Sequence, residues 1–414
     1  MSPVSAPAGL ADLISLADPA VIADPYPLMG RLREASPFTE LDGALVVFGR
    51  YQDCSRILRD PRASSERERS RLAPPRLRAE GPRTRSFLSL DPPDHTRLRG
   101  LVAKAFTPRV VARLGPRVSQ LTDELISAAA DRGGDEFELV SQLAYPLPVR
   151  IISELLGVPP GDHSRFAAWS ARLAHSVQPS FGAVDTAELA AAEQAALEFG
   201  DYFTELIAVR RAEPGDDLLT MLIRAEDSGQ RLTVDELIAT CVLLLVAGHE
   251  TTVGLISNAM LALLRDPAQL AALCADPHLA AGAVQETLRY DPPVQLTGRV
   301  ARGGMTFGQV TPPDGAVLLL LLAATGRDRS VFADPDVFDI RRGAKEHLAF
   351  AAGPHFCLGA PLARLEATIA LRAIAARMTG LELDEQALAY KSNFNLRGPE
   401  RMVVRCTDIR AQYH

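Results

Sequence analysis

Apolar residues recur at helical spacing along much of the chain, and this period predicts a mainly helical protein. The stretches that follow it are 121–130, 187–211, 234–264, 267–290 and 360–378. Thr233 and Glu236 have the spacing of a capping box, which predicts the start of the third helix. Asp266 followed by Pro267 is typical of an N-cap and a first helical position, so the fourth helix is expected to begin there.

Short strand-like runs interrupt this helical pattern. They lie near 44–48, 298–301, 316–322 and 402–405. They do not alternate with helices as βα units would, and no repeat of 20–50 residues occurs. The expected fold class is therefore mainly α with small β-sheets. No linker-like stretch divides the 414 residues, so we expect a single domain over 1–414 with a flexible N-terminal tail of about 20 residues.

Composition narrows the class of protein. The formal net charge is −7, and an acidic chain is a poor candidate for nucleic-acid binding. We find neither a signal peptide nor an apolar run long enough to span a membrane, so a cytoplasmic location without membrane contact is expected. Lysine occurs only at Lys104, Lys345 and Lys391, which we attribute to a GC-rich genome.

The segment 62–85 departs from the helical pattern. It holds eight arginines, several prolines and little hydrophobic periodicity, which predicts a loop with at most one short helix. Such a segment is more often a solvated surface, but long loops in compact domains also act as lids over substrates. A further hypothesis is that its arginines hold an acidic group of the substrate.

The five cysteines are scattered and form no CxxC pair, which disfavours a disulfide framework or a zinc site and favours a reducing compartment. They are Cys54, Cys241, Cys274, Cys357 and Cys406. Cys357 stands apart because a glycine-containing loop delivers it to the start of a long predicted helix. The free N–H groups of a helix N-terminus favour a thiolate.

The residues around Cys357 read Phe350-Ala-Ala-Gly-Pro-His-Phe-Cys-Leu-Gly359. This run resembles the cysteine-ligand loop of the cytochrome P450 family, Phe-Gly-x-Gly-x-His-x-Cys-x-Gly, with Ala351 in place of the first glycine. The resemblance implies the cytochrome P450 fold, in which haem b lies between a long distal helix and this proximal loop, with Cys357 as the iron ligand. A thiolate on haem iron favours cleavage of the O–O bond.

A second motif lies in the middle of the helix predicted over 234–264. It reads Ala247-Gly-His-Glu-Thr-Thr252 and resembles the oxygen-binding motif of the family. Gly248 would cost up to ~1 kcal/mol in a helix interior, which indicates a local widening or the close approach of a ligand. Glu250 and Thr251 are the expected catalytic pair, since an acid and an alcohol can pass protons to reduced dioxygen. The alternative is that the threonines merely bond back to helix carbonyls.

A third motif, Glu286-Thr-Leu-Arg289, resembles the Glu-x-x-Arg of the family. As an isolated i, i+3 pair it would be weak evidence. The resemblance implies that both residues join Arg342 in a buried network behind the haem. Their expected role is folding and haem retention.

Further positions match the family's propionate-binding residues. His95 and Arg99 lie at i, i+4 in Asp91-Pro-Pro-Asp-His-Thr-Arg-Leu-Arg99, so they share one helical face and can bind a propionate together. The resemblance adds Arg299 and His355 to them. It also implies that the backbone and side chains of four further residues lie against the haem, namely Ala247, Gly248, Phe350 and Gly359.

The resemblance extends from about Asp24 to the C-terminal strands. It places substrate contacts in the loop 62–90, around 171–190 and in three further segments. The pocket residues it implies are apolar, as a mostly hydrophobic pocket requires. They are Leu90, Leu244, Ala247, Val294, Leu296, Phe394 and Leu396.

The implied reaction is the insertion of one oxygen atom from O2 into a hydrophobic small molecule, by hydroxylation or epoxidation, in secondary metabolism. Electrons would come from a separate ferredoxin and ferredoxin reductase, because the chain has no flavin or dinucleotide motif. A monomer is expected. Two alternatives stay open, a peroxide-driven haem peroxygenase and a haem-binding relative without catalysis.

Overall fold

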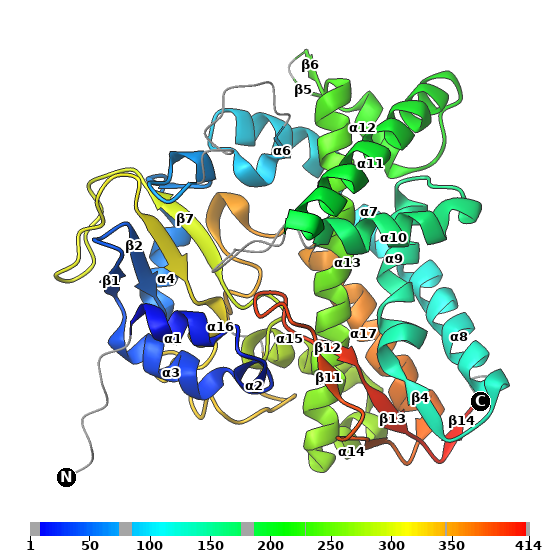
Figure 1. The fold of residues 1–414 in the computed structure, drawn as a ribbon. Helices are drawn as coiled ribbons and strands as arrows, with labels where there is room; N and C mark the ends of the chain where they lie inside the picture. Colours follow the sequence, from blue (N-terminus) through cyan, green and yellow to red (C-terminus); the bar gives the residue numbers. More distant parts are fainter. Residues whose placement is uncertain (1–8, 74–84, 175–185, 228, 344–345, 411–414) are drawn as a thin grey trace, which may run out of the picture.

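The structure, a computed structural model, describes residues 9–73, 85–174, 186–227, 229–343 and 346–410. It combines a helical part with a smaller part built on a five-stranded sheet (Figure 1). In Figure 1 the sheet and the N-terminal helices lie on the left and most of the long helices on the right, with α13 running between them. The expected fold class is confirmed.

The α-helices are α1 (Leu10–Ser15), α2 (Pro19–Ile22), α3 (Tyr26–Ala35), α4 (Tyr51–Arg59), α6 (Asp94–Ala105), α7 (Pro108–Arg113), α8 (Gly115–Arg132), α9 (Pro146–Leu155), α10 (His163–Ala174), α11 (Thr186–Ala212), α12 (Leu218–Arg224), α13 (Val234–Arg265), α14 (Pro267–Ala275), α15 (Ala280–Tyr290), α16 (Leu322–Thr325) and α17 (Ala360–Arg377). Single turns of tighter or wider helix are η1 (Arg67–Arg69), η2 (Phe87–Ser89), η3 (Val140–Ala144), η4 (Pro160–Asp162), η6 (Pro277–Leu279) and η7 (Gly353–His355).

The main sheet has the order β1-β2-β8-β7-β3, with β2 and β8 parallel and the other pairs antiparallel. Its strands are β1 (Phe38–Glu40), β2 (Leu45–Phe48), β3 (Ala63–Ser64), β7 (Thr297–Ala301) and β8 (Val317–Leu320). The small sheets use β4 (Glu136–Glu138), β5 (Glu226–Asp227), β6 (Gln230–Arg231), β9 (Met378–Thr379), β10 (Glu382–Leu383), β11 (Ala389–Tyr390), β12 (Pro399–Arg401), β13 (Val403–Arg405) and β14 (Asp408–Ile409). All four predicted strand regions are therefore strands.

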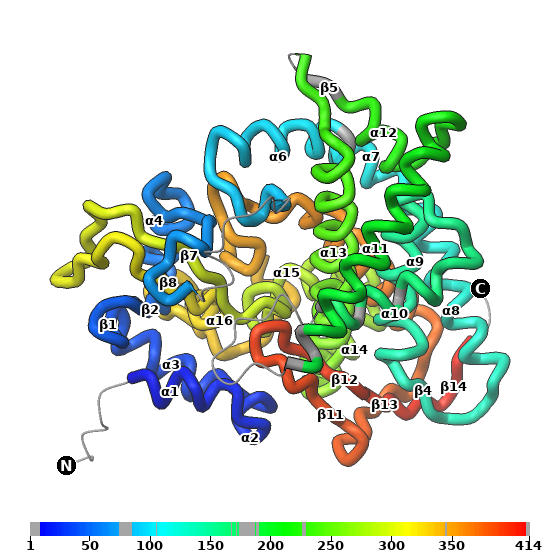
Figure 2. Tube along the Cα trace, turned by 45° about the horizontal axis from the view of Figure 1, so that its top comes forward, coloured from blue at the N-terminus to red at the C-terminus, as the bar shows by residue number. Residues whose placement is uncertain are grey.

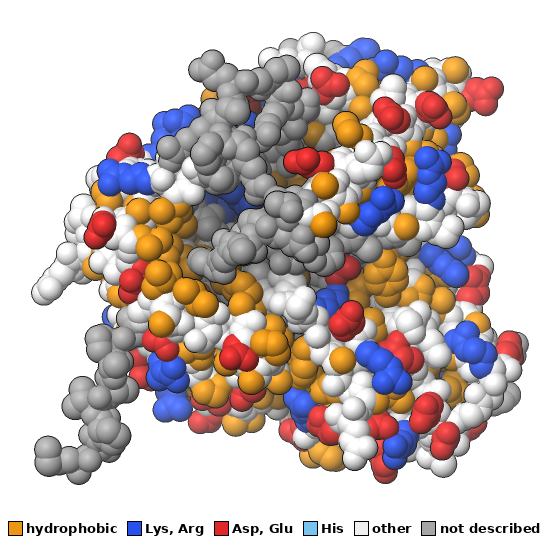
Figure 3. Space-filling model, viewed as in Figure 1, with side chains coloured by type: hydrophobic (Ala, Val, Ile, Leu, Met, Phe, Trp, Pro, Cys, Tyr) orange, Lys and Arg blue, Asp and Glu red, His pale blue; other side chains and the backbone are white. Residues whose placement is uncertain are grey.

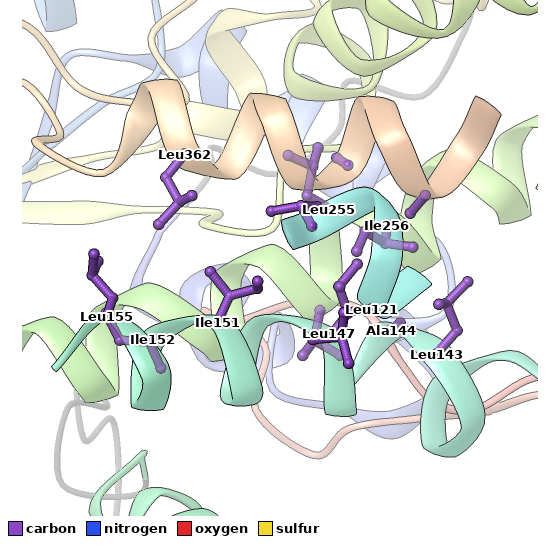
Figure 4. Packing of buried hydrophobic residues seen from close by; sticks show 14 of the residues in the cluster. Leu121, Leu143, Ala144, Leu147, Ile151, Ile152, Leu155, Leu255, Ile256 and Leu362 are labelled. Atoms are coloured by element: carbon purple, nitrogen blue, oxygen red, sulfur yellow. The ribbon is translucent and has the colours of Figure 1, made fainter. Parts of the chain in front are cut away.

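The largest hydrophobic cluster lies between the long helices. Side chains of α8, α9, α13 and α17 meet there, among them Leu121, Ile151, Leu255 and Leu362 (Figure 4). A second cluster joins α4 to one side of the sheet, and a third joins the other side to α1 and α3. Acidic and basic side chains are interspersed over the face shown in Figure 3.

Two sequence predictions need correction. The stretch 267–290 is not one helix, because Asp276 accepts a hydrogen bond from the His278 N–H and Pro277 begins a new turn, which separates α14 from α15. The tail of about 20 residues is also too long. Leu13 and Leu16 are each only 1% exposed and pack in the third cluster, so α1 is part of the folded core.

Helix α13 begins where the sequence predicted. Thr233 accepts a hydrogen bond from the Glu236 N–H, and the Glu236 carboxylate accepts one from the Thr233 N–H, which completes the capping box. By length and composition alone α13 could cross a membrane, contrary to the expectation that the chain has no apolar run of that length. Half of the most apolar 18-residue stretch of α13 is buried inside the protein. The helix packs against α9, α15 and α17, as the core helix of a globular protein does.

Candidate active site

The loop that carries Cys357 is tightly folded. The Cys357 N–H donates to the Phe350 carbonyl over 3.0 Å, and α17 begins three residues after the cysteine. Gly353 has a φ of +68°, and a Cβ atom there would collide with the Leu58 carbonyl. Ala351, which replaces the usual glycine of the motif, adopts a φ of +57°. The loop thus keeps its left-handed turn at a cost of roughly 1–2 kcal/mol.

The Cys357 thiol is under opposing influences. Burial raises its pKa, whereas the backbone N–H groups of Gly359 and Ala360 and the charges of Arg99 and Arg364 lower it, and the net direction is upward. The expected helix N-terminal donors are present, but in the polypeptide by itself they do not outweigh burial. A positively charged partner at Cys357 would favour its thiolate.

A cluster of nitrogen donors lies near the cysteine loop. His95 on α6 is 3% exposed, and neither Nδ1 nor Nε2 has a hydrogen-bond partner among the described residues. The rings of His95 and His355 have their centroids 4.1 Å apart, and His355 Nε2 lies 3.0 Å from Ser65 Oγ. Burial and then the charge of Arg299 lower the pKa of His355 to about 3.

Two guanidinium groups belong to the same cluster. Burial and the neighbouring charge of Arg67 lower the pKa of Arg299 to about 10, and Arg299 donates to the Gly298 carbonyl over 2.8 Å. Arg99 donates to the Phe356 carbonyl. Buried donors without acceptors are rare, and like charges repel unless an anion lies between them. The cluster therefore fits a carboxylated ligand, and the propionates of haem have the required chemistry.

The middle of α13 has one open face. Leu245 and His249 are fully buried, while Ala247 and Gly248 between them are exposed. The helix stays α-helical throughout, so the local widening expected at Gly248 is not seen. A Cβ at Gly248 would meet only the Ile152 side chain at 3.9 Å, which the protein would tolerate. The absence of a side chain therefore leaves room for a ligand rather than for protein packing.

The predicted catalytic pair lies beside this face, but both of its side chains are bonded to protein groups and not to each other. Thr251 Oγ1 donates to the Ala247 carbonyl over 2.9 Å, as the alternative interpretation of the motif stated. The Glu250 carboxylate pairs with Lys391 Nζ, and its Oε1 lies 3.3 Å from His249 Nε2. Burial alone would raise the pKa of Glu250, but His249 and Lys391 together lower it to about 2. Sequence reasoning missed Lys391, although its being one of three lysines was a signal.

Comparison with known proteins decides the family. The Cytochrome P450 family model matches residues 43–379. The chain is 42% identical to the cytochrome P450 monooxygenase PikC of Streptomyces venezuelae, over 92% of this chain and 91% of PikC. The chain belongs to the cytochrome P450 family. It is also 39% identical to the vitamin D(3) 25-hydroxylase of Pseudonocardia autotrophica, over 92% of this chain and 93% of that relative.

A solved structure extends this P450 match to the fold. The ligand-free CYP164A2 of Mycobacterium smegmatis superposes with a TM-score of 0.88 and 47% sequence identity, over 95% of this chain and 99% of that one. This protein is therefore a cytochrome P450 monooxygenase of the bacterial type, with haem b as its cofactor. Its reaction uses O2, a small-molecule substrate and redox partners.

The three residues of the predicted structural network of this P450 lie together. Glu286 and Arg289 form a two-point ion pair with distances of 2.6 and 2.8 Å, and Arg342 Nε lies 3.0 Å from Glu286 Oε1. Arg289 also donates to three backbone carbonyls, of Gly326, Pro335 and Val337. The network joins α15 to the segment 326–342.

The predicted pocket residues of the P450 do not all offer surface to a ligand. Val294 and Leu396 face each other in an isolated β-bridge, and both are half-buried. Leu90 and Leu244 are half-buried at the edge of the largest cluster. Leu296 is 2% exposed and packs with Phe394 in the cluster of α1 and α3, which argues against direct substrate contact by Leu296. Part of the predicted segment 171–190 lies outside the described residues.

The arginine-rich segment of the P450 is partly described. It contains β3 and η1, and residues 74–84 lie outside the described part. Three of its arginines pair with acidic residues of the same region, as Arg62–Asp60, Arg69–Glu66 and Arg85–Glu68. These pairs favour the surface interpretation over the binding of an acidic substrate.

Proposed function

We propose that Cys357 is the iron ligand and that haem b lies between the Cys357 loop and the open face of α13. The observation that carries this is that both ring nitrogens of the buried His95 have no hydrogen-bond partner among the described residues, while its ring centroid lies 4.1 Å from that of His355. His95, Arg99, Arg299 and His355 would hold the propionates. Phe350, Gly359, Ala247 and Gly248 would contact the macrocycle. Haem bound through a thiolate supplies the activation of dioxygen that the reaction needs.

Side chains of the protein are proposed to supply proton delivery and haem retention. Glu250 and Thr251 are proposed to deliver protons, which requires Glu250 to take up a proton and Thr251 to turn from the Ala247 carbonyl. Glu286, Arg289 and Arg342 keep α15 and the segment 326–342 together, so they act on folding and haem retention. These residues would support catalysis without contacting substrate.

The substrate proposed is a hydrophobic small molecule that is hydroxylated or epoxidised, as part of secondary metabolism. The apolar side chains of Leu90, Leu244, Val294 and Leu396 support this, as does the relative that hydroxylates vitamin D(3). We further propose that a separate ferredoxin and ferredoxin reductase supply electrons, and that the protein is a cytoplasmic monomer forming one P450 domain over 1–414.

The test is the carbon monoxide difference spectrum of the dithionite-reduced protein, for wild type, Cys357→Ala and the control Cys274→Ala. A strongly red-shifted Soret band in wild type and Cys274→Ala, lost in Cys357→Ala, is the expected result. A band at the wavelength of histidine or neutral thiol ligation in fresh wild-type protein would contradict the proposal. Turnover with peroxide, but not with reductant and O2, would favour the peroxygenase.

A further inference from the structure

Lys391 is a cation placed against the centre of α13. Its ammonium pairs with the Glu250 carboxylate, and the two side chains are only 20% and 12% exposed. Lys391 is the first residue after β11 in the β11–β12 hairpin, and β12 of this hairpin contacts α13 (Figures 1 and 2). In a chain that uses arginine at nearly every cationic position, this position has the compact ammonium of lysine.

The other oxygen of Glu250 is held as well. Glu250 Oε1 lies 3.3 Å from His249 Nε2, and His249 Nδ1 lies 2.8 Å from Ser170 Oγ on α10. The Tyr145 ring packs edge-on against His249, and the pKa of Tyr145 is raised to about 12 by burial and then by the charge of Glu250. Among the described residues, the titratable groups that face Glu250 are thus Lys391, His249 and Tyr145, and Lys391 comes from the loop that joins β11 to β12.

Lys391 also begins the turn that carries predicted pocket residues. Its N–H donates to the Gly398 carbonyl over 3.3 Å, which closes the turn 391–398. Within the turn, Asn393 Oδ1 accepts hydrogen bonds from the N–H groups of Asn395 and Leu396, and Leu396 bridges to Val294. Lys391 and the predicted pocket residue Leu396 therefore belong to one hydrogen-bonded turn.

We propose that Lys391 is a positioning residue of the monooxygenase reaction, an inference that rests on the proposed function. It holds the Glu250 carboxylate on the β11 side of α13, and a substrate that displaces the turn 391–398 releases Glu250 toward Thr251. Once released, Glu250 takes up one proton from solvent water and passes one proton on through the Thr251 hydroxyl. Lys391 stays an ammonium throughout, so the balance is one proton moved from solvent to the active site.

The first measurement is a pH titration of the substrate-free protein by difference infrared spectroscopy, with the Glu250 carboxyl band assigned through Glu250→Gln. In wild type the carboxylate should stay ionised down to a pH near 2, the value to which its pKa is lowered. In Lys391→Met the midpoint should move upward toward that of ordinary glutamate, ~4.3, because His249 alone then remains to lower it. Lys391→Arg should restore much of the wild-type midpoint.

The second measurement is the peroxide released per reductant consumed in the absence of substrate. Lys391→Met should raise peroxide release without substrate about tenfold, less than the ~10²–10⁴-fold that a general acid itself contributes. In the Glu250→Gln background the same change should add nothing, because the two residues act through one pair. Arg405→Met, which removes a cation from an exposed pair with Asp384, is the matched control and should behave as wild type.

Three results would overturn the role of Lys391. They are an unchanged infrared midpoint in Lys391→Met, peroxide release no higher than that of Arg405→Met, or an effect of equal size in the Glu250→Gln background. A wild type without the red-shifted carbon monoxide band would instead overturn the proposed function. The infrared titration separates the two failures, since it requires no turnover.

Discussion

Glu250 and Glu366 are both glutamates on long core helices, α13 and α17, but their surroundings differ. Glu250 meets Lys391 and His249, which lower its pKa to about 2 against the effect of burial. Glu366 is 2% exposed and forms no ion pair within the described residues, and burial raises its pKa to about 8. At neutral pH Glu250 is therefore charged, while Glu366 is mostly neutral.

The difference shows that burial alone does not set the charge of an acid in this core. A cation within reach reverses the direction of the shift. Glu286 extends the comparison, because it is 4% exposed and meets two guanidinium groups, of Arg289 and Arg342. The charged Glu250 and the neutral Glu366 thus both lie on core helices, and their partners distinguish them.

The largest effect is expected where a buried acid loses its main cation. Arg289→Met should lower the free energy of unfolding by about 3–5 kcal/mol, because Glu286 is left buried with a reduced set of partners. Urea unfolding of the holoprotein measures this. The double variant Glu286→Gln/Arg289→Met should recover part of the loss, since it removes the uncompensated charge. A loss below about 1 kcal/mol in Arg289→Met would contradict the conclusion that buried acids of this core depend on their cationic partners.

Glu366→Gln should stabilise the protein at alkaline pH. The folded-state pKa of about 8 lies above the ordinary value of ~4.3. Between these pH values the unfolded state releases the proton of Glu366 while the folded state keeps it, so the stability of wild type falls as the pH rises. The variant should equal wild type near pH 4 and exceed it by a few kcal/mol at pH 8, in order of magnitude. Thermal unfolding across this range tests the prediction, with the exposed Glu385→Gln as control. A variant no more stable than wild type at pH 8 would mean that Glu366 is not held neutral.

Lys391→Met should destabilise the protein with the opposite pH dependence. The lowered pKa of Glu250 contributes stability above its ordinary value of ~4.3, and this contribution is lost as the pH falls toward 2. The variant should be less stable by about 1–2 kcal/mol at pH 7 and should approach wild type in acid. Denaturant unfolding at several pH values measures the difference. A deficit that persists undiminished in acid would point to lost packing instead of the ion pair.

The smallest effect is expected at the surface. Arg265 and Glu385 form an ion pair with side chains 45% and 57% exposed. Arg265→Met should change the free energy of unfolding by no more than about 0.5 kcal/mol, because water screens the pair. The comparison of buried with exposed pairs would fail if this variant lost as much stability as Arg289→Met does in the same urea titration.

Local patterns predicted much of the fold. The capping box at Thr233 and the start of α14 at Asp266 were correct, because caps depend on neighbours in sequence. The break at Asp276-Pro277 carried the same kind of signal, but the apolar period continued across it and concealed it. Leu13 and Leu16 were missed as core residues because the third cluster that buries them forms only in the folded chain.

The sequence by itself determined the order of the motifs, hence the family, and the residue types at the Cys357 loop and at Gly248. These follow from spacing along the chain. Only the tertiary structure decided that Lys391 meets Glu250 from 141 residues away. It also decided that, within the described part of the chain, His95 lies beside His355 without a hydrogen-bond partner and Glu366 forms no ion pair. The reason is physical: the charge of a buried group depends on its solvation and on neighbours brought from distant parts of the chain, and no local pattern encodes them.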